Sequence, residues 1–467
     1  MHIPRFTSLE QSLQAMKEMS AELKTDEVTI VGNPSYIYRP FDVYILPTKI
    51  DTPRNKLTAI VKDMDGTTTT TEDLCVHSLE FMVGKITGWD VEKGWSGLDH
   101  EKDHPHIIGN STTKHVEYLI KTYGDGIVPD EFRRAYMFAV LWTLCTGKDP
   151  GRREEVMANL SYFGLGGIKS DDQFLDFINN GNFSTERARE LSRTLTKDFP
   201  GLPRLESFED RVRAAIDVYY QRYHEILAAI DEGKGRELAG KILSDPDSNL
   251  IEPMPGVAVF LAAVKGWLGD ELSFFGNELK DILIHNELAD ISEKDIDHGV
   301  SLLSGLGKYF EKNPVRVAIV TSSIAYEAKI VLTEVFKILY RQAEKWEISA
   351  SRKEAVLNGF RHYSNTYDAF ITATDSSEIR LKPHPDLYSL ALHRMGVGRE
   401  DFDSVIGFED SESGTRAIRA AGVGLCVALP FPFTRGQDLS AASHILHGGL
   451  PEALIGESLF LDHSKFI

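Results

Sequence analysis

Hydrophobic and polar positions change pattern three times along this chain. Residues 7–24 have helical spacing and are followed by two short apolar runs, 28–31 and 43–46, that predict strands. From about residue 74 to 250, apolar residues recur at helical spacing in one segment after another, with glycine and proline in the gaps. Short runs rich in β-branched residues then return. The predicted strands of the main sheet are residues 57–61, 315–320, 369–373, 404–408 and 424–429.

The alternation of these strands with helical patterning predicts an α/β fold, in which crossovers build a Rossmann-like parallel sheet. Its first strand is separated from the others by the long helical stretch, so we predict a large all-helical cap domain inserted after that strand. The predicted domains are a catalytic core (56–73 and 251–467), the cap (74–250) and an N-terminal extension of unknown role (1–55). Because the insertion follows a strand's C-terminal end, we expect it to hang over the site that the strand carries.

Composition narrows the classes of partner. The 467 residues include 51 Lys and Arg against 70 Asp and Glu, a net charge of -19. This balance argues against binding to nucleic acid or an anionic membrane, and a phosphorylated substrate would need local positive charge. Three scattered cysteines, the absence of a signal-peptide pattern and the short apolar runs indicate a cytoplasmic globular protein. The oligomeric state cannot be predicted from these features.

Two carboxylates follow the first strand of the predicted sheet. Asp63 and Asp65 stand two positions apart in the segment KDMDGT at residues 62–67, where the strand opens into a loop. The carboxyl ends of strands are the usual place for chemistry in an open α/β sheet. Carboxylates are rarely buried without a partner, so the pair indicates a metal, a proton or both. An ordinary acidic turn before a helix explains the same residues.

Two later segments offer groups that suit an anion. Strand 315–320 is followed by Thr321 and Ser322, whose hydroxyls can donate to a phosphate, although a helix N-cap uses the same residues. Lys382 precedes Pro383 and Pro385, which restrict the backbone and can fix the direction of the ammonium group. An isolated lysine is more often a solvated surface charge.

A second carboxylate pair follows strand 404–408. Glu409 and Asp410 lead into a segment of small residues that predicts a helix. Carboxylate oxygens at two separate strand ends suit Mg²⁺, with water and a substrate phosphate completing the octahedron. Acidic residues that complement the dipole at the start of a helix are the alternative.

In order and type, these residues resemble the haloacid dehalogenase-like (HAD) hydrolase superfamily. The resemblance is closest to its phosphatase and phosphomutase branch with a helical cap after the first strand, similar to β-phosphoglucomutase and phosphoglycolate phosphatase. It covers residues 57–73 and roughly 252–429, including the segments EPMPGV at 252–257 and YDAFIT at 367–372. Lys62 departs from the pattern, because an aromatic or aliphatic residue usually precedes the nucleophile there, and the insertions are much larger than in common members.

The resemblance implies a role for each motif residue. Asp63 would be the nucleophile that forms an aspartyl-phosphate, and Asp65 the general acid and base. Thr321 and Ser322 would bind the phosphoryl oxygens, and Lys382 would offset their charge. Mg²⁺ would be held by Asp63, the backbone carbonyl of Asp65, and Asp410, with Glu409 a ligand or a partner of one.

In the superfamily that the chain resembles, the phosphatases and phosphomutases have an Asp at the position of Asp65, so the resemblance implies a phosphatase acting on a small phosphorylated metabolite rather than carbon–halogen or carbon–phosphorus cleavage. The same residues also suit a phosphomutase acting on a sugar phosphate, and a non-catalytic binding protein on this scaffold is a third hypothesis.

Within the helical insertion the signals are weaker. Gly109, Ser111 and Lys114 loosely resemble the loop by which family caps contact substrate, but a helix capped by Ser111 explains them equally well. The three histidines between 100 and 106 suit a metal less well than a solvated polar loop. Arginine pairs such as Arg152 and Arg153 could bind an anionic substrate, although such pairs are more often exposed helix charges.

Overall fold

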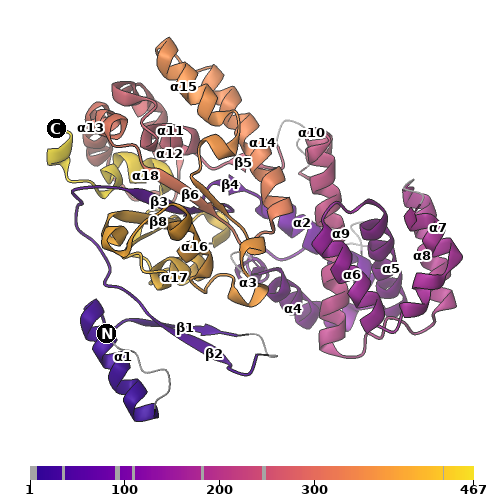
Figure 1. Cartoon of the computed structure of the whole chain (residues 1–467). Helices are drawn as coiled ribbons and strands as arrows, with labels where there is room; N and C mark the ends of the chain where they lie inside the picture. The colour runs from indigo at the N-terminus through magenta and orange to yellow at the C-terminus, as the bar shows by residue number, and fades with distance from the viewer. Residues whose placement is uncertain are drawn as a thin grey trace. The chain divides into compact units, whose positions relative to one another are not determined.

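The computed structural model describes residues 8–33, 37–89, 95–107, 111–179, 183–243, 249–434 and 436–467. The chain forms two compact units (Figure 1). Unit 1 consists of Met1–Thr70 and Glu252–Ile467, and unit 2 is the inserted segment Thr71–Ile251.

A six-stranded parallel sheet forms the centre of unit 1. Its strand order is β10-β9-β8-β3-β6-β7. The strands are β3 (Ala59–Asp63), β6 (Arg316–Val320), β7 (Ala369–Ile371), β8 (Val405–Glu409), β9 (Leu425–Ala428) and β10 (His444–Ile445). This confirms the predicted α/β fold with a Rossmann-like parallel sheet.

Helices cover both faces of this sheet, which is why its strands place apolar residues on both faces instead of alternating them with polar ones. One face of β3 and β6 packs with Leu387 and Tyr388 of α16 (Asp386–Arg394) and with Ile418 of α17 (Glu412–Ala420). On the other face, Phe260 of the fully buried helix α11 (Val257–Val264) meets Phe408 of β8, with ring centroids 5.6 Å apart. The other helices of unit 1 are α1 (Leu9–Leu23), α12 (Gly276–His285), α13 (Glu293–Lys312), α14 (Ala325–Glu344), α15 (Ala350–Phe360) and α18 (Gly449–Ile455).

The strands are added to one side of β3 first and to its other side afterwards. The chain runs outward from β3 through β6 to β7, then returns to place β8 on the opposite side of β3 and continues to β9 and β10. In open α/β sheets, ligand sites lie at such a switch point, outside the carboxyl ends of the strands. The fold therefore directs attention to the residues that follow β3, β6, β7 and β8.

The observed bounds of the five predicted strands differ from the sequence prediction by one or two residues, and Glu409, for example, is the last residue of β8. The first sheet strand was predicted at 57–61, but its ladder pairs Ala59–Asp63 with Arg316–Val320, so Asp63 is the last residue of the strand and not part of the following loop. The strand predicted at 369–373 ends at Ile371, because Ala373–Asp375 forms a 3-10 turn capped by Thr372. The two-residue strand β10 is too short for a periodicity signal.

An antiparallel hairpin precedes the sheet in the chain. Its strands, β1 (Val28–Gly32) and β2 (Phe41–Ile45), pair Val28 with Ile45 and Gly32 with Phe41. A second, two-stranded pairing joins β4 (Thr69–Thr70) to β5 (Glu252–Pro253), where the chain leaves and re-enters unit 1.

Unit 2 contains helices and no strand among its described residues. Helix α5 packs against α2, α8 and α9 within it. The helices are α2 (Glu72–Thr87), α3 (His104–Ile107), α4 (Thr112–Tyr123), α5 (Pro129–Thr146), α6 (Pro150–Tyr162), α7 (Asp172–Asn179), α8 (Thr185–Asp198), α9 (Phe208–Asp231) and α10 (Gly235–Ile242).

One prediction for this unit is wrong: Arg152 is buried rather than exposed, because its guanidinium forms an ion pair with the fully buried Asp217. In the part of the chain that the structure describes, no helix is both long and apolar enough to cross a membrane.

Candidate active site

Asp63 lies at the carboxyl end of the central strand β3, in a buried position. Its backbone carbonyl accepts a hydrogen bond from the Thr68 hydroxyl at 2.6 Å. The turn between them is closed by backbone bonds from Thr68 and Thr69 to the carbonyl of Met64. These bonds fix the direction in which the Asp63 carboxylate leaves the strand.

Lys382 brings the two carboxylate segments together. Its ammonium group contacts Oδ1 of Asp63 and donates to Oε1 of Glu409 at 2.6 Å. All three side chains are almost completely buried. A buried ammonium between two carboxylates is stabilised by both, which raises the pKa of Lys382 despite the desolvation that opposes it. This lysine is therefore held as a cation inside the site.

Glu409 ends strand β8 and is held by more than one donor. Its Oε1 also accepts from the Tyr388 hydroxyl at 2.9 Å, and its Oε2 accepts from the Ser411 hydroxyl at 2.9 Å and the Asp410 amide at 3.1 Å. Burial raises the pKa of Glu409, but Lys382 and these hydroxyls outweigh it and lower the pKa overall. The residue is an ionised and oriented carboxylate.

For Asp63, the influences that raise the pKa outweigh those that lower it. Burial raises the pKa of its carboxyl, the Lys382 ammonium opposes this, and the negative charges of Glu409 and Asp65 raise the pKa further. A divalent cation at this place would reverse that balance, because a metal is the largest local charge in such a site.

The described residues offer one group of carboxylates that suits a metal. Ligand atoms of Asp63, Glu409 and Asp410 all lie within 4.8 Å of one another, and all three residues are buried. Asp410 also accepts from the Thr67 hydroxyl at 3.3 Å. Hard oxygen donors in this number suit Mg²⁺, which binds protein through a few carboxylates and completes its shell with water and phosphate. The residues present therefore fit a small divalent cation.

Asp65 faces the hydroxyls that follow β6. Its Oδ2 accepts from Thr321 at 3.0 Å and from Ser323 at 3.5 Å. The Thr321 hydroxyl in turn accepts from the backbone amide of Ser323 at 2.9 Å. The structure thus places Thr321 and Ser323 beside Asp65. Ser322, the predicted partner of Thr321, has no contact with Asp65 among those that the structure shows.

Two glycines make room for these carboxylates. Gly66 has a φ of 78°, and a Cβ there would lie 2.5 Å from Oδ2 of Asp410. A Cβ at Gly414, in the first turn of α17, would lie 1.7 Å from Oε1 of Glu409. Both positions therefore require glycine if the acidic group is to keep its arrangement.

Residues of the N-terminal hairpin reach the loop that carries Lys382. Arg380 binds Asp386 through two hydrogen bonds and also pairs with Asp42 at 3.3 Å. The Tyr44 hydroxyl lies 3.0 Å from Nη1 of Arg380 and 2.8 Å from Nδ1 of His384. Neither Asp42 nor Tyr44 was identified from the sequence, because only the fold brings them to this loop.

The weaker predictions in unit 2 have different outcomes. Gly109 lies outside the described residues. Ser111 is the N-cap of α4 and Lys114 is an exposed residue of that helix. Contact between these residues and a substrate stays a prediction. The rings of His104 and His100 are tilted relative to one another with centroids 4.0 Å apart, and neither residue belongs to a group that suits a metal among the described residues.

Comparisons with known proteins find similarity in solved structures. No protein-family model matches the sequence, and no curated protein matches it significantly. The structure of CbbY from Rhodobacter sphaeroides with phosphate is 15% identical, with 85% of this chain and 96% of that chain covered and a TM-score of 0.39. A mutant of CbbY with xylulose-(1,5)bisphosphate gives the same values. A HAD family hydrolase from Deinococcus radiodurans R1, with bound phosphate and sodium, is 13% identical, with 88% and 99% covered and a TM-score of 0.36.

A HAD family hydrolase is thus among the solved structures to which this chain is similar. At such low identity, function can be inferred only from the residues of the site.

Proposed function

We propose that this chain is a Mg²⁺-dependent phosphoryl-transfer enzyme, and specifically a phosphatase that hydrolyses a small phosphorylated metabolite. One observation carries the proposal: residues from the ends of β3 and β8 and from the loop after β7 meet in one buried cluster at the carboxyl edge of the sheet. In that cluster, Lys382 bridges Asp63 and Glu409, and Asp410 completes a group of three carboxylates. An acidic group with one fixed cation suits a dianionic substrate only if a metal is also present.

In the first step, a carboxylate oxygen of Asp63 would attack phosphorus. A bond from this oxygen to phosphorus would form, and the bond from phosphorus to the leaving oxygen would break, giving an aspartyl-phosphate and an alcohol. Oδ1 contacts Lys382, so we assign the attack to Oδ2. Formation of this intermediate divides one difficult displacement into two easier ones.

Asp65 would act first as general acid and then as general base. It would protonate the leaving oxygen in the first step, and in the second it would take a proton from the water that attacks the aspartyl-phosphate and releases inorganic phosphate. Its position supports this role, because Oδ2 is already within hydrogen-bond distance of a hydroxyl, that of Thr321. Thr321 would donate to a phosphoryl oxygen, together with Ser322 or Ser323, and Lys382 would offset the charge of the transferring group.

Mg²⁺ would be held by Asp63, Glu409 and Asp410, with the backbone carbonyl of Asp65 as a further ligand. When bound, it would neutralise charge on the phosphoryl oxygens. Glu409 also accepts a hydrogen bond from Lys382, so Glu409 would link the metal to the lysine that is proposed to bind the phosphoryl group.

A phosphomutase is the second candidate, since it uses the same residues and returns the phosphoryl group to the substrate. It is distinguished by a requirement for a bisphosphate activator and by little release of free phosphate. A binding protein on this scaffold is the third candidate, and the dense contacts around Lys382 argue against it, because a binding site does not need a nucleophile in contact with a cation.

The test is phosphate release from a panel of phosphorylated sugars, nucleotides and small acids, with Mg²⁺ or EDTA, for the wild type and for Asp63→Asn. We expect Mg²⁺-dependent release that Asp63→Asn lowers by about 10³-fold or more, because no aspartyl-phosphate can form. The matched control is Asp281→Asn, since Asp281 is an exposed residue of α12. Equal release by wild type and Asp63→Asn would contradict the proposal. Little free phosphate from any compound of the panel, together with isomerisation of a sugar phosphate that requires its bisphosphate, would favour the phosphomutase.

A further inference from the structure

The N-terminal hairpin turns the polar side chains of its strands toward the rest of unit 1 and nearly all of the apolar ones toward solvent. On the inner side, Asp42 of β2 pairs with Arg380 at 3.3 Å, and the Thr29 hydroxyl of β1 accepts from Nε of Arg416 at 2.8 Å. A strand pair that covers a core normally does the reverse, with apolar residues inside and polar residues outside. The outer face of this hairpin is therefore unusual for a surface that remains in water.

The outer face consists of three cross-strand pairs without a charged residue: Val28 with Ile45, Ile30 with Val43, and Gly32 with Phe41. Alternate residues of a strand share a face, and the alternation of exposed and buried residues along β1 places these positions outside. Val28, Ile30, Phe41 and Val43 are each between 42% and 57% exposed. An exposed apolar patch of this kind, on an otherwise acidic protein, is typical of an interaction surface.

Strand β2 also has an open backbone edge. The Leu46 amide donates to the Glu27 carbonyl at 3.0 Å, directly beyond the paired residues of the two strands. Hydrogen-bonded pairs alternate along an antiparallel ladder, so the backbone groups of Phe41, Val43 and Ile45 point away from β1. Among the described residues, none of these groups has another hydrogen-bond partner. Such an edge is a template for pairing with a further strand.

The outer edge of β1 is less open than that of β2. Nη2 of Arg416 donates to the carbonyl of Ile30, so part of this edge is already covered by α17. Proteins usually protect an exposed edge with a lysine, a proline or a bulge, and the sequence of β2, FDVYI, contains no lysine or proline. This difference identifies β2 as the strand that can pair.

We propose that β2 pairs with β2 of a second copy of this chain, antiparallel about a two-fold axis at Val43. The two hairpins would then form one sheet of four strands. In this register Val43 faces Val43 of the other copy and Phe41 faces Ile45, so the open N–H and C=O groups of all three residues bond across the axis. A two-fold dimer uses the same patch of both copies, which a self-complementary edge provides. The proposal does not depend on the proposed function.

Charge favours this arrangement. Two chains that each have a net charge of -19 repel one another, so a contact between them requires a patch without like charges. The outer face provides such a patch. The acid within β2, Asp42, would lie opposite Tyr44 of the other copy and not opposite Asp42, and Arg380 already balances its charge. A sheet of four strands with an apolar face is also more stable than a two-stranded ribbon.

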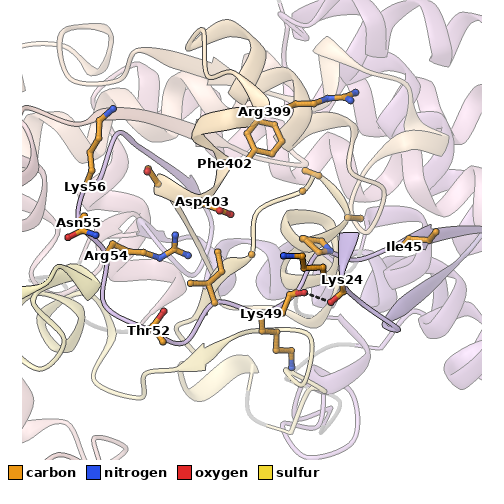
Figure 2. Close-up of a pocket in the computed structure, with 18 of the residues that line it drawn as sticks. Lys24, Ile45, Lys49, Thr52, Arg54, Asn55, Lys56, Arg399, Phe402 and Asp403 are labelled. Carbon is orange, nitrogen blue, oxygen red and sulfur yellow. Dashed lines mark hydrogen bonds between the residues drawn. The ribbon is translucent and has the colours of Figure 1, made fainter. Parts of the chain in front are cut away.

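The pairing would end at Ile45. Beyond this residue the chain leaves the hairpin, and Ile45, Pro47 and Lys49 line a cavity of 970 Å³ (Figure 2). Pro47 has no N–H to donate to a ladder. The contact is therefore limited to the five residues of β2, which is close to the usual length of a strand.

Sedimentation equilibrium of the full chain tests the dimer. We expect the wild type to dimerise, and Val43→Lys and Val43→Glu each to weaken the dimer by about 100-fold or more, because either variant places like charges opposite one another at the axis. An equimolar mixture of the two variants should recover a dimer with one copy of each, since opposite charges then meet. Ile284→Lys, at an exposed apolar residue of α12, is the matched control and should dimerise as the wild type does.

Amide hydrogen exchange locates the contact. The N–H groups of Phe41, Val43 and Ile45 should exchange more slowly in the wild-type dimer than in monomeric Val43→Lys, whereas the amides of the central sheet should be unchanged. Recovery by mixing also separates a weakened contact from misfolding, because a misfolded variant would not regain a dimer when its counterpart is added.

Three results would overturn the proposal. The first is a wild type that stays monomeric at the highest concentration reached, and slow exchange at Val43 in that monomer would mean that another segment of the same chain covers the edge. The second is a dimer that both Val43→Lys and Val43→Glu retain, which would place the contact on another surface. The third is a mixture of the two variants that stays monomeric, which would exclude a two-fold axis at Val43.

Discussion

The hydroxyl of Tyr44 lies 2.8 Å from Nδ1 of His384, although the two residues are 340 positions apart. The rings also meet edge to face, with centroids 5.9 Å apart. His384 is buried and stands two positions after Lys382. The N-terminal hairpin therefore braces the loop that directs the lysine between Asp63 and Glu409.

Tyr44→Phe tests this bracing. The substitution keeps the ring contact and removes the hydrogen bonds to His384 and Arg380, so the loop should hold Lys382 less precisely. We expect kcat for phosphate release to fall about threefold to tenfold while the melting temperature changes little. Steady-state kinetics on the best substrate of the panel measure this. Tyr38→Phe is the control, since Tyr38 is fully exposed. An equal change in both variants would show that the hairpin does not position the loop.

Gly414→Ala should disable the carboxylate site through a single methyl group. Its Cβ would lie 1.7 Å from Oε1 of Glu409, so the carboxylate would have to leave Lys382 and Tyr388. We expect activity to fall on the order of 10²-fold and the free energy of unfolding to fall by about 1–3 kcal/mol. Activity and urea unfolding are measured on the same preparation.

The matched control for that substitution is Gly166→Ala, because a Cβ at Gly166 would meet nothing within 4 Å. Full activity of Gly414→Ala would mean that Glu409 can occupy another position and still support the reaction, which would count against its proposed role.

Much of the main sheet could be predicted because its strands are short apolar runs, and β3, β6 and β8 end at polar motifs. The motifs that follow β3 and β8 and the lysine after β7 were recognised as one group before their distances were known. The exact residue at which each strand begins and ends was harder to predict. Periodicity could not show that Asp63 belongs to the strand itself, since Leu57 and Thr58 have the same apolar or β-branched character as the residues that pair.

Other features depend on tertiary contacts that leave no local pattern. The choice of Ser323 over Ser322 beside Asp65 depends on the turn after β6. Arg152 is buried because the charge of Asp217 balances its own, and Asp217 belongs to a helix 65 positions later in the chain. The contact between Tyr44 and the lysine loop joins opposite ends of the chain, and nothing in the spacing of hydrophobic residues indicates it.

Lys62 is a residue whose removal should stabilise the protein. Its side chain is completely buried, its Nζ lies 5.3 Å from the ring centroid of Phe260, and within the described part of the chain this nitrogen has no hydrogen-bond partner. Burial lowers the pKa of Lys62 to about 7, and the Asp63 charge opposes this only in part. Lys62→Met keeps the length of the side chain and removes the polar group. We expect the free energy of unfolding at pH 7 to rise by about 1–3 kcal/mol.

Urea unfolding of Lys62→Met, beside Lys294→Met at an exposed position of α13, measures this effect. A lower midpoint for Lys62→Met than for the wild type would show that the amino group has a stabilising partner in solution.

The helical unit should lose stability in mild acid through His77. Nε2 of this residue lies 3.2 Å from Nη2 of Arg222, and burial together with the Arg222 charge lowers the pKa of His77 from 6.5 to about 4. The unfolded chain therefore binds more protons between these pH values, so the contribution of His77 is fully present above pH 6.5 and is lost as the pH falls toward 4.

His77→Gln should remove part of this acid sensitivity. The difference in free energy of unfolding between pH 7 and pH 5 should shrink by no more than about 1–2 kcal/mol, because His77 is only partly buried and solvent screens its charge. Amide hydrogen exchange in α2 and α9 reports on this unit directly, and it should become less dependent on pH in the variant. His393→Gln, at an exposed histidine of α16, should leave that dependence unchanged. If His77→Gln retains the full acid sensitivity, the loss of stability must come from other groups, and His77 must remain protonated or fully solvated in the folded state.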